Sequence, residues 1–194
     1  DEQKREMLAT VNMDADRVTR LIRELLDVSR IDAGRLELRR TEFDLAAMAE
    51  GIVGRFELQH DRHSFRLSFP DGFPRVYADP DKIEQVLTNL VENAVKYSDG
   101  GAVTVTGQVT ETEVEVAVRD QGVGIPADQL PLIFTKFYRR AGSGAPSGTG
   151  LGLFIARGLV EAHAGRIWAD SAPGQGTTLR FRLPRGGLEL AGIT

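Results

Sequence analysis

The sequence predicts an α+β fold in which helices cover one face of a mixed, mainly antiparallel sheet, forming a two-layer α/β sandwich. Two segments that alternate polar and apolar residues, 102–109 and 113–120, flank a short polar turn and predict a β-hairpin. Two further strands are predicted at 166–171 and 177–184, joined by a turn that contains two glycines. Helical periodicity fills the segments between the strands, as is typical of this fold class.

An amphipathic helix precedes the sandwich, within residues 1–40. Its apolar residues recur at alternating spacings of three and four, close to a heptad repeat: Leu8, Val11, Ala15, Val18, Ile22 and Leu25. This stripe fits either a surface helix on its own domain or half of an intermolecular bundle, and its length favours the bundle. The main domain is expected at 41–186, and the tail 187–194 carries no usable signal.

The first half of the main domain contains two more predicted helices. Periodicity predicts one helix within 43–60, and a strand is predicted at 64–69. The next helix has a sharp start, because Asp79 can cap it and Pro80 suits its first position. Apolar residues gather on one side of this helix, which is therefore expected to pack against the sheet.

A neighbouring side of that helix carries Asn89, Asn93, Lys96 and Tyr97, which follow one another at helical spacings. An asparagine oxygen can bind Mg²⁺, and a lysine can meet a phosphate as a point charge. A tyrosine ring can pack on a base or a ribose. Such residues are also typical of a solvated helix face. Their position directly ahead of the hairpin and its glycine loop favours a binding site.

A glycine loop follows the hairpin, where Asp120 comes just before Gly122 and Gly124. A carboxylate at the sheet edge can accept a hydrogen bond from an exocyclic amine, and glycines let the backbone approach a flat ligand. A plain Asp-Gly turn would read the same. A dinucleotide-binding fingerprint would need a helix that starts inside the motif and a parallel strand after it, and a P-loop would need a lysine after its glycines. Neither is present.

A second glycine loop, GTGLGL at 148–153, leads into a helix predicted over 151–163. Exposed N–H groups at the start of a helix bind phosphate well. The preceding segment, 140–147, is rich in glycine, serine and alanine. We interpret it as a lid that closes over phosphates rather than as a plain connector.

Composition excludes several other classes of function. The chain has 194 residues, no cysteine and a formal net charge of −4. Disulfides and cysteine-bound metals are therefore excluded, and a nucleic-acid partner is not expected. No apolar run approaches the roughly 18 residues that cross a bilayer. A cytoplasmic location is expected, with any membrane anchor outside this chain.

Together these segments resemble the catalytic and ATP-binding domain of sensor histidine kinases. These kinases belong to the GHKL superfamily, with gyrase, the ninety-kilodalton heat-shock chaperone and MutL. The matching segments are NLVENAVKYS at 89–98 (N box), DQGVGIP at 120–126 (first glycine box), IFTKFYR at 133–139 (F box), GTGLGL at 148–153 (second glycine box) and the turn at 174–177. The resemblance covers residues from about 43 to 184 and implies the Bergerat fold.

The resemblance also implies ATP and Mg²⁺ as cofactors. It implies that Asn93 is the Mg²⁺ ligand and that Asp120 recognises the adenine. The other residues implied to bind ATP are Lys96, Tyr97, Gly122, Gly124, Ile125, Phe137, Thr149, Gly150, Leu151, Gly152, Leu153 and Thr177. The residues implied to assist catalysis are Asn89, Glu92, Lys96, Arg139 and Arg140.

The residue at position 89 favours phosphoryl transfer over hydrolysis. In the hydrolysing relatives a glutamate stands four residues before the Mg²⁺ asparagine and activates water, whereas Asn89 cannot take a proton at pH 7. Phosphoryl transfer mainly needs positioning and charge neutralisation. Besides Mg²⁺, the resemblance suggests Lys96 and Arg139 or Arg140 for that charge, and Glu92 for polarising an incoming histidine.

The phosphoacceptor histidine is expected outside this chain. The helix at 7–33 resembles the second helix of the family's dimerisation and phosphotransfer hairpin, but a motif like HELRTPL is absent. None of His60, His63 and His163 lies in such a motif, and His163 is expected to end a helix. The acceptor would then lie on a missing segment or on another polypeptide. The intact protein is expected to be a homodimer that passes the phosphate to a response regulator.

Two alternative functions remain. The chain could be a nucleotide-sensing or scaffolding module without kinase turnover, which the missing acceptor would explain. It could also be a serine kinase of the anti-sigma type, which shares the ATP fold. The N-terminal helix and the FYR segment fit histidine kinases better.

Overall fold

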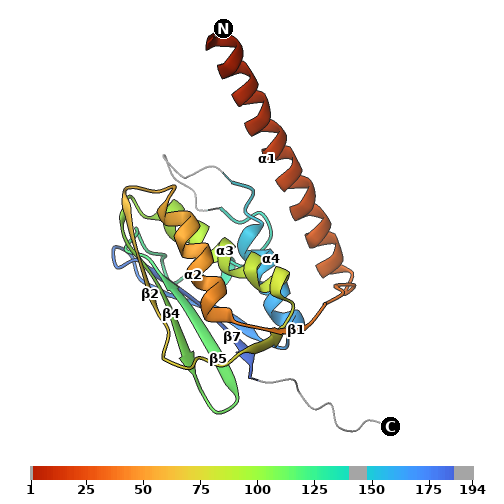
Figure 1. Ribbon diagram of the computed structural model, residues 1–194, viewed down its shortest axis with the longest axis vertical. Coiled ribbons are helices and arrows are strands. Elements are labelled where there is room, and N and C mark those ends of the chain that lie inside the picture. Colours follow the sequence, from red (N-terminus) through yellow and green to blue (C-terminus); the bar gives the residue numbers. More distant parts are fainter. Residues whose placement is uncertain (1, 140–147, 186–194) are drawn as a thin grey trace. The chain divides into compact units, whose positions relative to one another are not determined.

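The computed structural model describes residues 2–139 and 148–185, without the side chains of residues 2–6, 8–14, 16 and 17. It divides into two compact units, residues 1–36 and 37–194. The first unit contains helix α1, Glu2–Asp32 (Figure 1). In the described part of its apolar stripe, Val18, Ile22 and Leu25 each keep more than half of their surface exposed. Helix α1 is thus an amphipathic helix, as predicted, and these three apolar side chains are exposed.

The second unit is built on a five-stranded sheet with the order β2-β4-β5-β7-β6. The strands are β2 (His63–Ser68), β4 (Gly101–Val109), β5 (Glu113–Arg119), β6 (Arg166–Ser171) and β7 (Thr177–Pro184). Strand β2 runs parallel to β4, and the other neighbours are antiparallel. The predicted mixed, mainly antiparallel sheet is therefore confirmed, and each of these strands lies within one residue of its predicted bounds.

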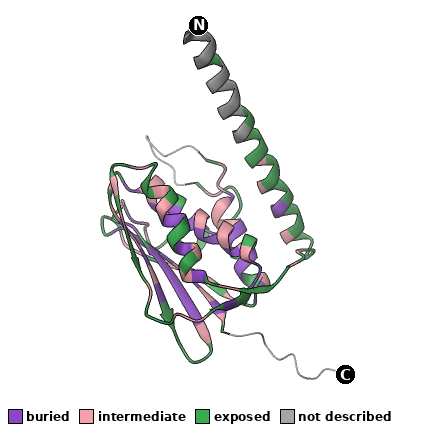
Figure 2. Cartoon of the chain, viewed as in Figure 1, coloured by how far each residue is buried: buried purple, intermediate pink, exposed green. Residues whose placement is uncertain are grey.

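Three helices cover one face of this sheet: α2 (Leu45–Glu57), α3 (Pro80–Tyr97) and α4 (Gly152–Ala162) (Figure 1). Most buried residues of this unit lie where these helices meet the sheet (Figure 2). The arrangement is the predicted two-layer sandwich. None of the described helices is both long enough and apolar enough to cross a bilayer.

Strict alternation along β5 and β7 builds the core. Val116 pairs with Phe181 and Val118 with Leu179, and all four side chains are almost fully buried. Burying one such side chain contributes about 1.5–3 kcal/mol. The core therefore fixes the register of β5 and β7, which matters because the candidate site begins where β5 ends.

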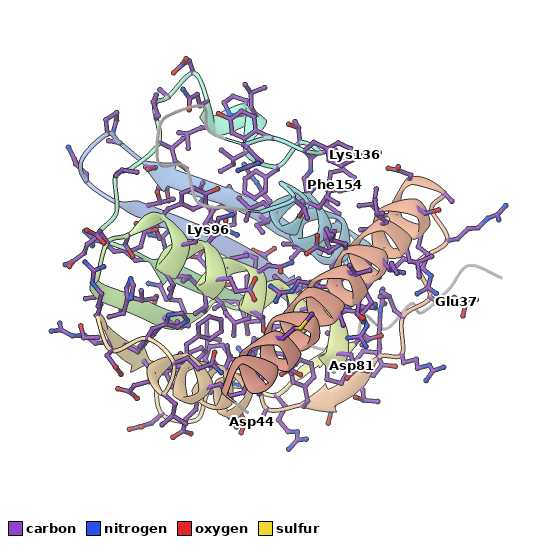
Figure 3. The ribbon with its side chains drawn as sticks, turned by 90° about the horizontal axis from the view of Figure 1, so that it is seen from above. Glu37, Asp44, Asp81, Lys96, Lys136 and Phe154 are labelled. Atoms are coloured by element: carbon purple, nitrogen blue, oxygen red, sulfur yellow. The ribbon has the colours of Figure 1, made fainter. Side chains whose placement is uncertain are left out.

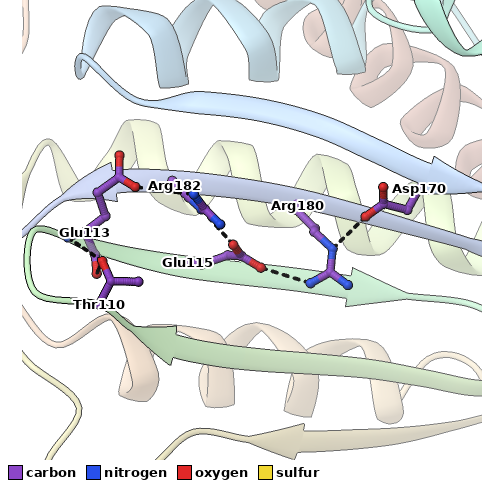
Figure 4. Close-up of polar contacts among 6 residues, drawn as sticks. All are labelled: Thr110, Glu113, Glu115, Asp170, Arg180 and Arg182. Carbon is purple, nitrogen blue, oxygen red and sulfur yellow. Dashed lines mark hydrogen bonds and ion pairs between the residues drawn. The ribbon is translucent and has the colours of Figure 1, made fainter.

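Ion pairs fasten the opposite face of the same strands (Figure 4). Glu115 on β5 is nearly buried and accepts hydrogen bonds from Arg180 Nη1 at 2.9 Å and from Arg182 Nε at 2.7 Å, both on β7. Arg180 Nε also reaches Asp170 Oδ2 on β6 at 2.9 Å. The three strands β5, β7 and β6 are thus tied together by apolar packing on one face and by charge on the other.

A small antiparallel sheet, formed by β1 (Thr41–Phe43) and β3 (Val76–Ala78), was not predicted. Each strand has three residues, which is too short for an alternating pattern to be recognised.

The predicted helix at 43–60 is shorter than expected. It begins at Leu45, because Asp44 Oδ1 caps it by accepting a hydrogen bond from Ala47 N at 2.9 Å, and it ends at Glu57. The spacing of Leu130, Ile133, Phe134 and Phe137 predicts a short helical piece, and this prediction is wrong over most of its length. Only Leu130–Leu132 form a 3₁₀ turn, and Phe137 has a left-handed φ of 60°.

A polar junction around Asp79 joins the start of α3 to the end of α4 and to Arg39. Asp79 caps α3 through Lys82 N at 3.2 Å, as predicted, and its Oδ2 accepts a hydrogen bond from Arg39 N at 2.8 Å. Its own N–H donates to His163 Nε2 at 3.0 Å, while His163 Nδ1 contacts Leu159 O at 2.7 Å. Because a carbonyl only accepts, Nδ1 carries the proton and the ring is neutral. His163 ends α4, as predicted.

This junction predicts a pH-dependent stability. Burial lowers the pKa of His163 below its ordinary value of 6.5, and protonation of Nε2 would also set two N–H groups against each other. The unfolded chain therefore binds this proton more readily. The contribution of neutral His163 to the free energy of unfolding should be complete above pH 6.5 and should decrease as the pH falls from 6.5 towards the folded-state pKa.

Urea unfolding at pH 7.5, 6.5 and 5.5 measures this effect. The variant His163→Gln should lack this part of the pH dependence, while all other titrating groups remain. An unchanged loss of stability below pH 6.5 in His163→Gln would contradict the assignment.

Candidate functional site

One wall of the site is formed where β5 ends beside the start of β7. Asp120 follows β5 directly and is 4% exposed. Its Oδ1 atom accepts hydrogen bonds from Gly122 N at 2.7 Å and from Thr177 N at 3.1 Å, and Asp120 N donates to Thr177 O at 2.9 Å. Burial raises the pKa of Asp120, and the two hydrogen bonds from backbone N–H groups oppose that shift.

Close backbone contacts explain the glycines around Asp120. A Cβ atom at Gly122 would lie 2.3 Å from Tyr97 O, and one at Gly124 would lie 1.9 Å from Ala172 O. A Cβ atom at Gly176 would lie 2.1 Å from Asp120 O. The loop after β5 is thus pressed between the end of α3 and the turn that connects β6 to β7, and only glycine fits there.

A single hydroxyl group, that of Ser171, connects these segments. Ser171 Oγ accepts a hydrogen bond from Ile125 N at 2.8 Å and donates one to Gly176 O at 2.8 Å. It also lies 3.0 Å from Thr177 Oγ1. Ser171 was not among the predicted site residues. Its position opposite Thr177, across the glycine turn, was the signal that could have identified it.

The side of α3 that carries Asn89 and Asn93 meets the start of α4. Asn89 Nδ2 donates to Gly152 O at 3.0 Å, and Asn93 Nδ2 donates to Asn89 O at 2.6 Å. Because a carbonyl only accepts, these contacts assign the nitrogen of each amide. The oxygen Oδ1 of Asn93 is then the end of its side chain that suits a cation.

The C-terminal end of α3 carries a cluster of aromatic and basic groups. Lys96 Nζ lies 5.2 Å from the centre of the Tyr97 ring, and a Cβ atom at Gly148 would lie 2.4 Å from Lys96 Nζ. Burial raises the pKa of Tyr97, the charge of Arg139 lowers it, and Tyr138 raises it. Lys96, Tyr97, Tyr138 and Arg139 therefore gather beside the second glycine loop.

The start of α4 has no side-chain cap. Leu151 occupies the cap position, and its N–H bonds to Thr149 Oγ1 at 3.2 Å. The first turn holds no acidic residue. Within the described part of the chain, the cap position thus provides no side-chain acceptor for the N–H groups of residues 152–154, which suits a phosphate-binding helix end.

The F box, residues 133–139, contacts the second glycine loop and the helix α4 that follows it. A Cβ atom at Gly150 would lie 2.8 Å from the backbone of Phe137 and Tyr138. Lys136 Nζ lies 5.0 Å from the centre of the Phe154 ring on α4, and the two side chains are neighbours in Figure 3. These contacts hold the F box against the start of α4.

The structure brings most of the predicted site residues together. Asp120, the glycines at 122 and 124, Ile125 and Thr177 form one wall. The other group comprises Asn89, Asn93, Lys96, Tyr97, Arg139 and the segment 149–153. The backbone of Phe137 lies beside Gly150, while the residue is 62% exposed. Glu92, next to Asn93 in the sequence, lies on the exposed side of α3. Arg140 and the predicted lid at 140–147 lie outside the described residues.

Among the described residues, no three or more His, Cys, Asp or Glu side chains come together in a way that could hold a metal ion.

Comparison with known proteins agrees with this geometry. Residues 78–187 match the family model of histidine kinase-, DNA gyrase B-, and HSP90-like ATPases. Over 184 residues the chain is 40% identical to the sensor histidine kinase WalK of Bacillus subtilis (strain 168), a match that covers 92% of this chain and 30% of WalK. The chain therefore spans less than a third of that relative.

Two solved structures are similar as well. The histidine kinase ThkA, in a complex with the response regulator TrrA, has a TM-score of 0.68 and 29% identity, over 87% of this chain and 49% of ThkA. Full-length ShkA in complex with AMPPNP has a TM-score of 0.82, over 94% of this chain and 39% of ShkA. Its 24% identity makes that likeness one of fold alone.

The glycine contacts give a prediction with a matched control. Gly174 and Gly176 have φ values of 75° and 76°, but a Cβ atom at Gly174 would meet nothing within 4 Å. Gly174→Ala should cost about 1–2 kcal/mol of unfolding free energy, from the left-handed backbone alone. Gly176→Ala should cost a further 1–3 kcal/mol or so, because its methyl group meets Asp120 O. Urea unfolding measures both, and equal costs would refute the close contact.

Proposed function

The chain belongs to the family of histidine kinase-, DNA gyrase B- and HSP90-like ATPases, and on that basis we propose that it is the ATP-binding catalytic domain of a two-component sensor histidine kinase. The observation that carries the proposal is the hydrogen bond from Asn89 to Gly152 O. It joins the α3 face that holds Asn93 and Lys96 to the uncapped start of α4. The proposed metal ligand, a basic side chain and the N–H groups proposed to bind phosphate thus lie on adjoining elements.

The adenine of ATP is proposed to lie against the wall that contains Asp120. Both hydrogen bonds that the described residues make to this carboxylate end on Oδ1, so Oδ2 can accept one from the exocyclic amine. The glycines at 122 and 124 allow the base to approach the backbone, beside Ile125 and Thr177. Tyr97 would pack beside the base or the ribose.

The phosphates are proposed to lie at the start of α4. The N–H groups of Gly152 and Leu153 would bind them, with the loop of Thr149, Gly150 and Leu151 around them. Lys96 supplies positive charge near Gly148. Arg139 lies close enough to Tyr97 to influence its pKa, and it would add to this charge. We also propose that Phe137 binds ATP and that Arg140 assists catalysis, as the resemblance implies.

Asn93 fits a Mg²⁺ ion. Its nitrogen is held by Asn89 O, so its oxygen is the available ligand, and Mg²⁺ needs only one or two protein ligands when phosphates and water supply the rest. The bound ion would neutralise phosphate charge.

Asn89 supports phosphoryl transfer rather than hydrolysis. Its side-chain nitrogen donates to Gly152 O, and an amide cannot accept a proton from water at neutral pH. We therefore propose transfer of the γ-phosphate to a histidine outside this chain, with Glu92 near the metal ligand as the group that polarises the histidine.

The proposed partners are the acceptor hairpin, a second copy of the protein and a response regulator. The exposed stripe of α1, with Val18, Ile22 and Leu25, offers a surface for helices of such a hairpin dimer. The complex of the related kinase ThkA with TrrA supports a response regulator as the recipient of the phosphate. The alternative is a nucleotide-binding scaffold without turnover.

Transfer to a separately supplied hairpin tests the proposed function. The chain is mixed with ATP labelled at the γ-phosphate, Mg²⁺ and a helical hairpin that carries a relative's histidine motif. The hairpin should acquire label that is lost in acid and stable in base. Asp120→Asn should reduce labelling roughly 10- to 100-fold, since it removes a charged acceptor and adds a donor.

Asp170→Asn is the matched control. It makes the same chemical change on the open face of β6, where the side chain is 62% exposed, and should leave labelling unchanged. If ATP binds but no hairpin is labelled, the scaffold alternative replaces the kinase.

The metal assignment predicts a loss that binding can measure. Calorimetry would give the affinity for ATP with Mg²⁺ and with a chelator, for each variant. Asn93→Ala should reduce the gain from Mg²⁺ at least about tenfold, whereas Asn93→Asp keeps an oxygen ligand and should keep the gain. An unchanged gain in Asn93→Ala would remove Asn93 from the metal site.

A further inference from the structure

The hydroxyl group of Ser171 has all of its hydrogen bonds assigned by geometry. A serine hydroxyl has one proton to donate and two lone pairs that accept. Its single proton goes to Gly176 O at 2.8 Å, because a carbonyl cannot donate. One lone pair accepts the proton of Ile125 N at 2.8 Å.

This assignment fixes the direction of the contact between Ser171 and Thr177. Their oxygens lie 3.0 Å apart, and either could donate if the pair stood alone. Since the proton of Ser171 is already used, Thr177 Oγ1 must donate to Ser171 Oγ. Only the lone pairs of Thr177 Oγ1 then remain for any other group.

Thr177 also belongs to the wall that holds Asp120. Its N–H donates to Asp120 Oδ1 at 3.1 Å, and its residue is 8% exposed. Asp120 offers Oδ2 as an acceptor, so both side chains at this point of the wall present acceptors.

We propose that Ser171 is a positioning residue that locks the Thr177 hydroxyl as an acceptor and thereby makes the pocket select a purine with an amino group, rather than an oxo group, at the position facing this wall. The inference rests on the proposed function, because it takes the wall around Asp120 as the site of the base. It adds Ser171, which contacts Thr177 from behind that wall, and assigns it an effect on the choice of base.

The proposed selectivity depends on whether the Thr177 hydroxyl can rotate. An oxo group needs a donor, and neither Asp120 Oδ2 nor the Thr177 hydroxyl offers one while Thr177 Oγ1 donates its proton to Ser171 Oγ. Without the Ser171 hydroxyl, the Thr177 hydroxyl can turn and donate to an oxo group. Loss of Ser171 should therefore relax discrimination, beyond any general weakening from the unpaired Ile125 N and Gly176 O.

Calorimetry with ATP and inosine triphosphate, its 6-oxo counterpart, tests the inference. For the unchanged chain, ATP should bind more tightly. In Ser171→Ala the ratio of the two affinities should narrow about 3- to 10-fold, the effect of one hydrogen bond. Ser171→Thr retains a hydroxyl group and should restore much of the ratio.

A second route avoids dependence on one variant. Thr177→Ala removes the oriented hydroxyl directly and should change the ratio of the ATP and inosine triphosphate affinities. Adding Ser171→Ala to it should change that ratio no further, since both substitutions act through one group. Equal weakening of both nucleotides in Ser171→Ala, or additive changes in the double variant, would show a purely structural role and overturn the inference. Failure of the unchanged chain to bind ATP would overturn the proposed function itself.

Discussion

The site depends on the two N–H groups that converge on one oxygen of Asp120. They come from Gly122, two residues away, and from Thr177, 57 residues away. The sheet brings these segments together, because β5 and β7 are neighbours with a register fixed by their apolar faces. Burying a carboxylate is costly unless hydrogen bonds compensate, so the pairing of these two strands and the buried Asp120 carboxylate stabilise each other.

The close backbone contacts follow from this arrangement. The loop after β5 passes between Tyr97 O at the end of α3 and the turn at 172–176, with no space for a Cβ atom at Gly122 or Gly124. The glycines that are proposed to let a base approach thus already permit the close approach of the protein's own backbone. This loop is therefore a tightly packed part of the fold.

Local chemistry made much of this predictable from sequence. Asp79 and Pro80 mark the start of α3, and Asp120 before two glycines marks the end of β5, because each depends on residues within one turn. What could not be predicted depends on partners far along the chain. His163 was expected to end a helix, but its bond to Asp79 N spans 84 residues. Phe137 adopts a left-handed backbone beside Gly150, which no helical periodicity reveals. Ser171 looks like any serine at a strand end until its three neighbours are known.

The junction at Asp79 has a consequence for the segment that enters the domain. One carboxylate caps α3 with Oδ1 and holds Arg39 N with Oδ2, so the incoming segment and the first turn of α3 share one side chain. That helix carries Asn89 and Asn93. Asp79 therefore couples the backbone at Arg39 to the first turn of this helix through a single side chain.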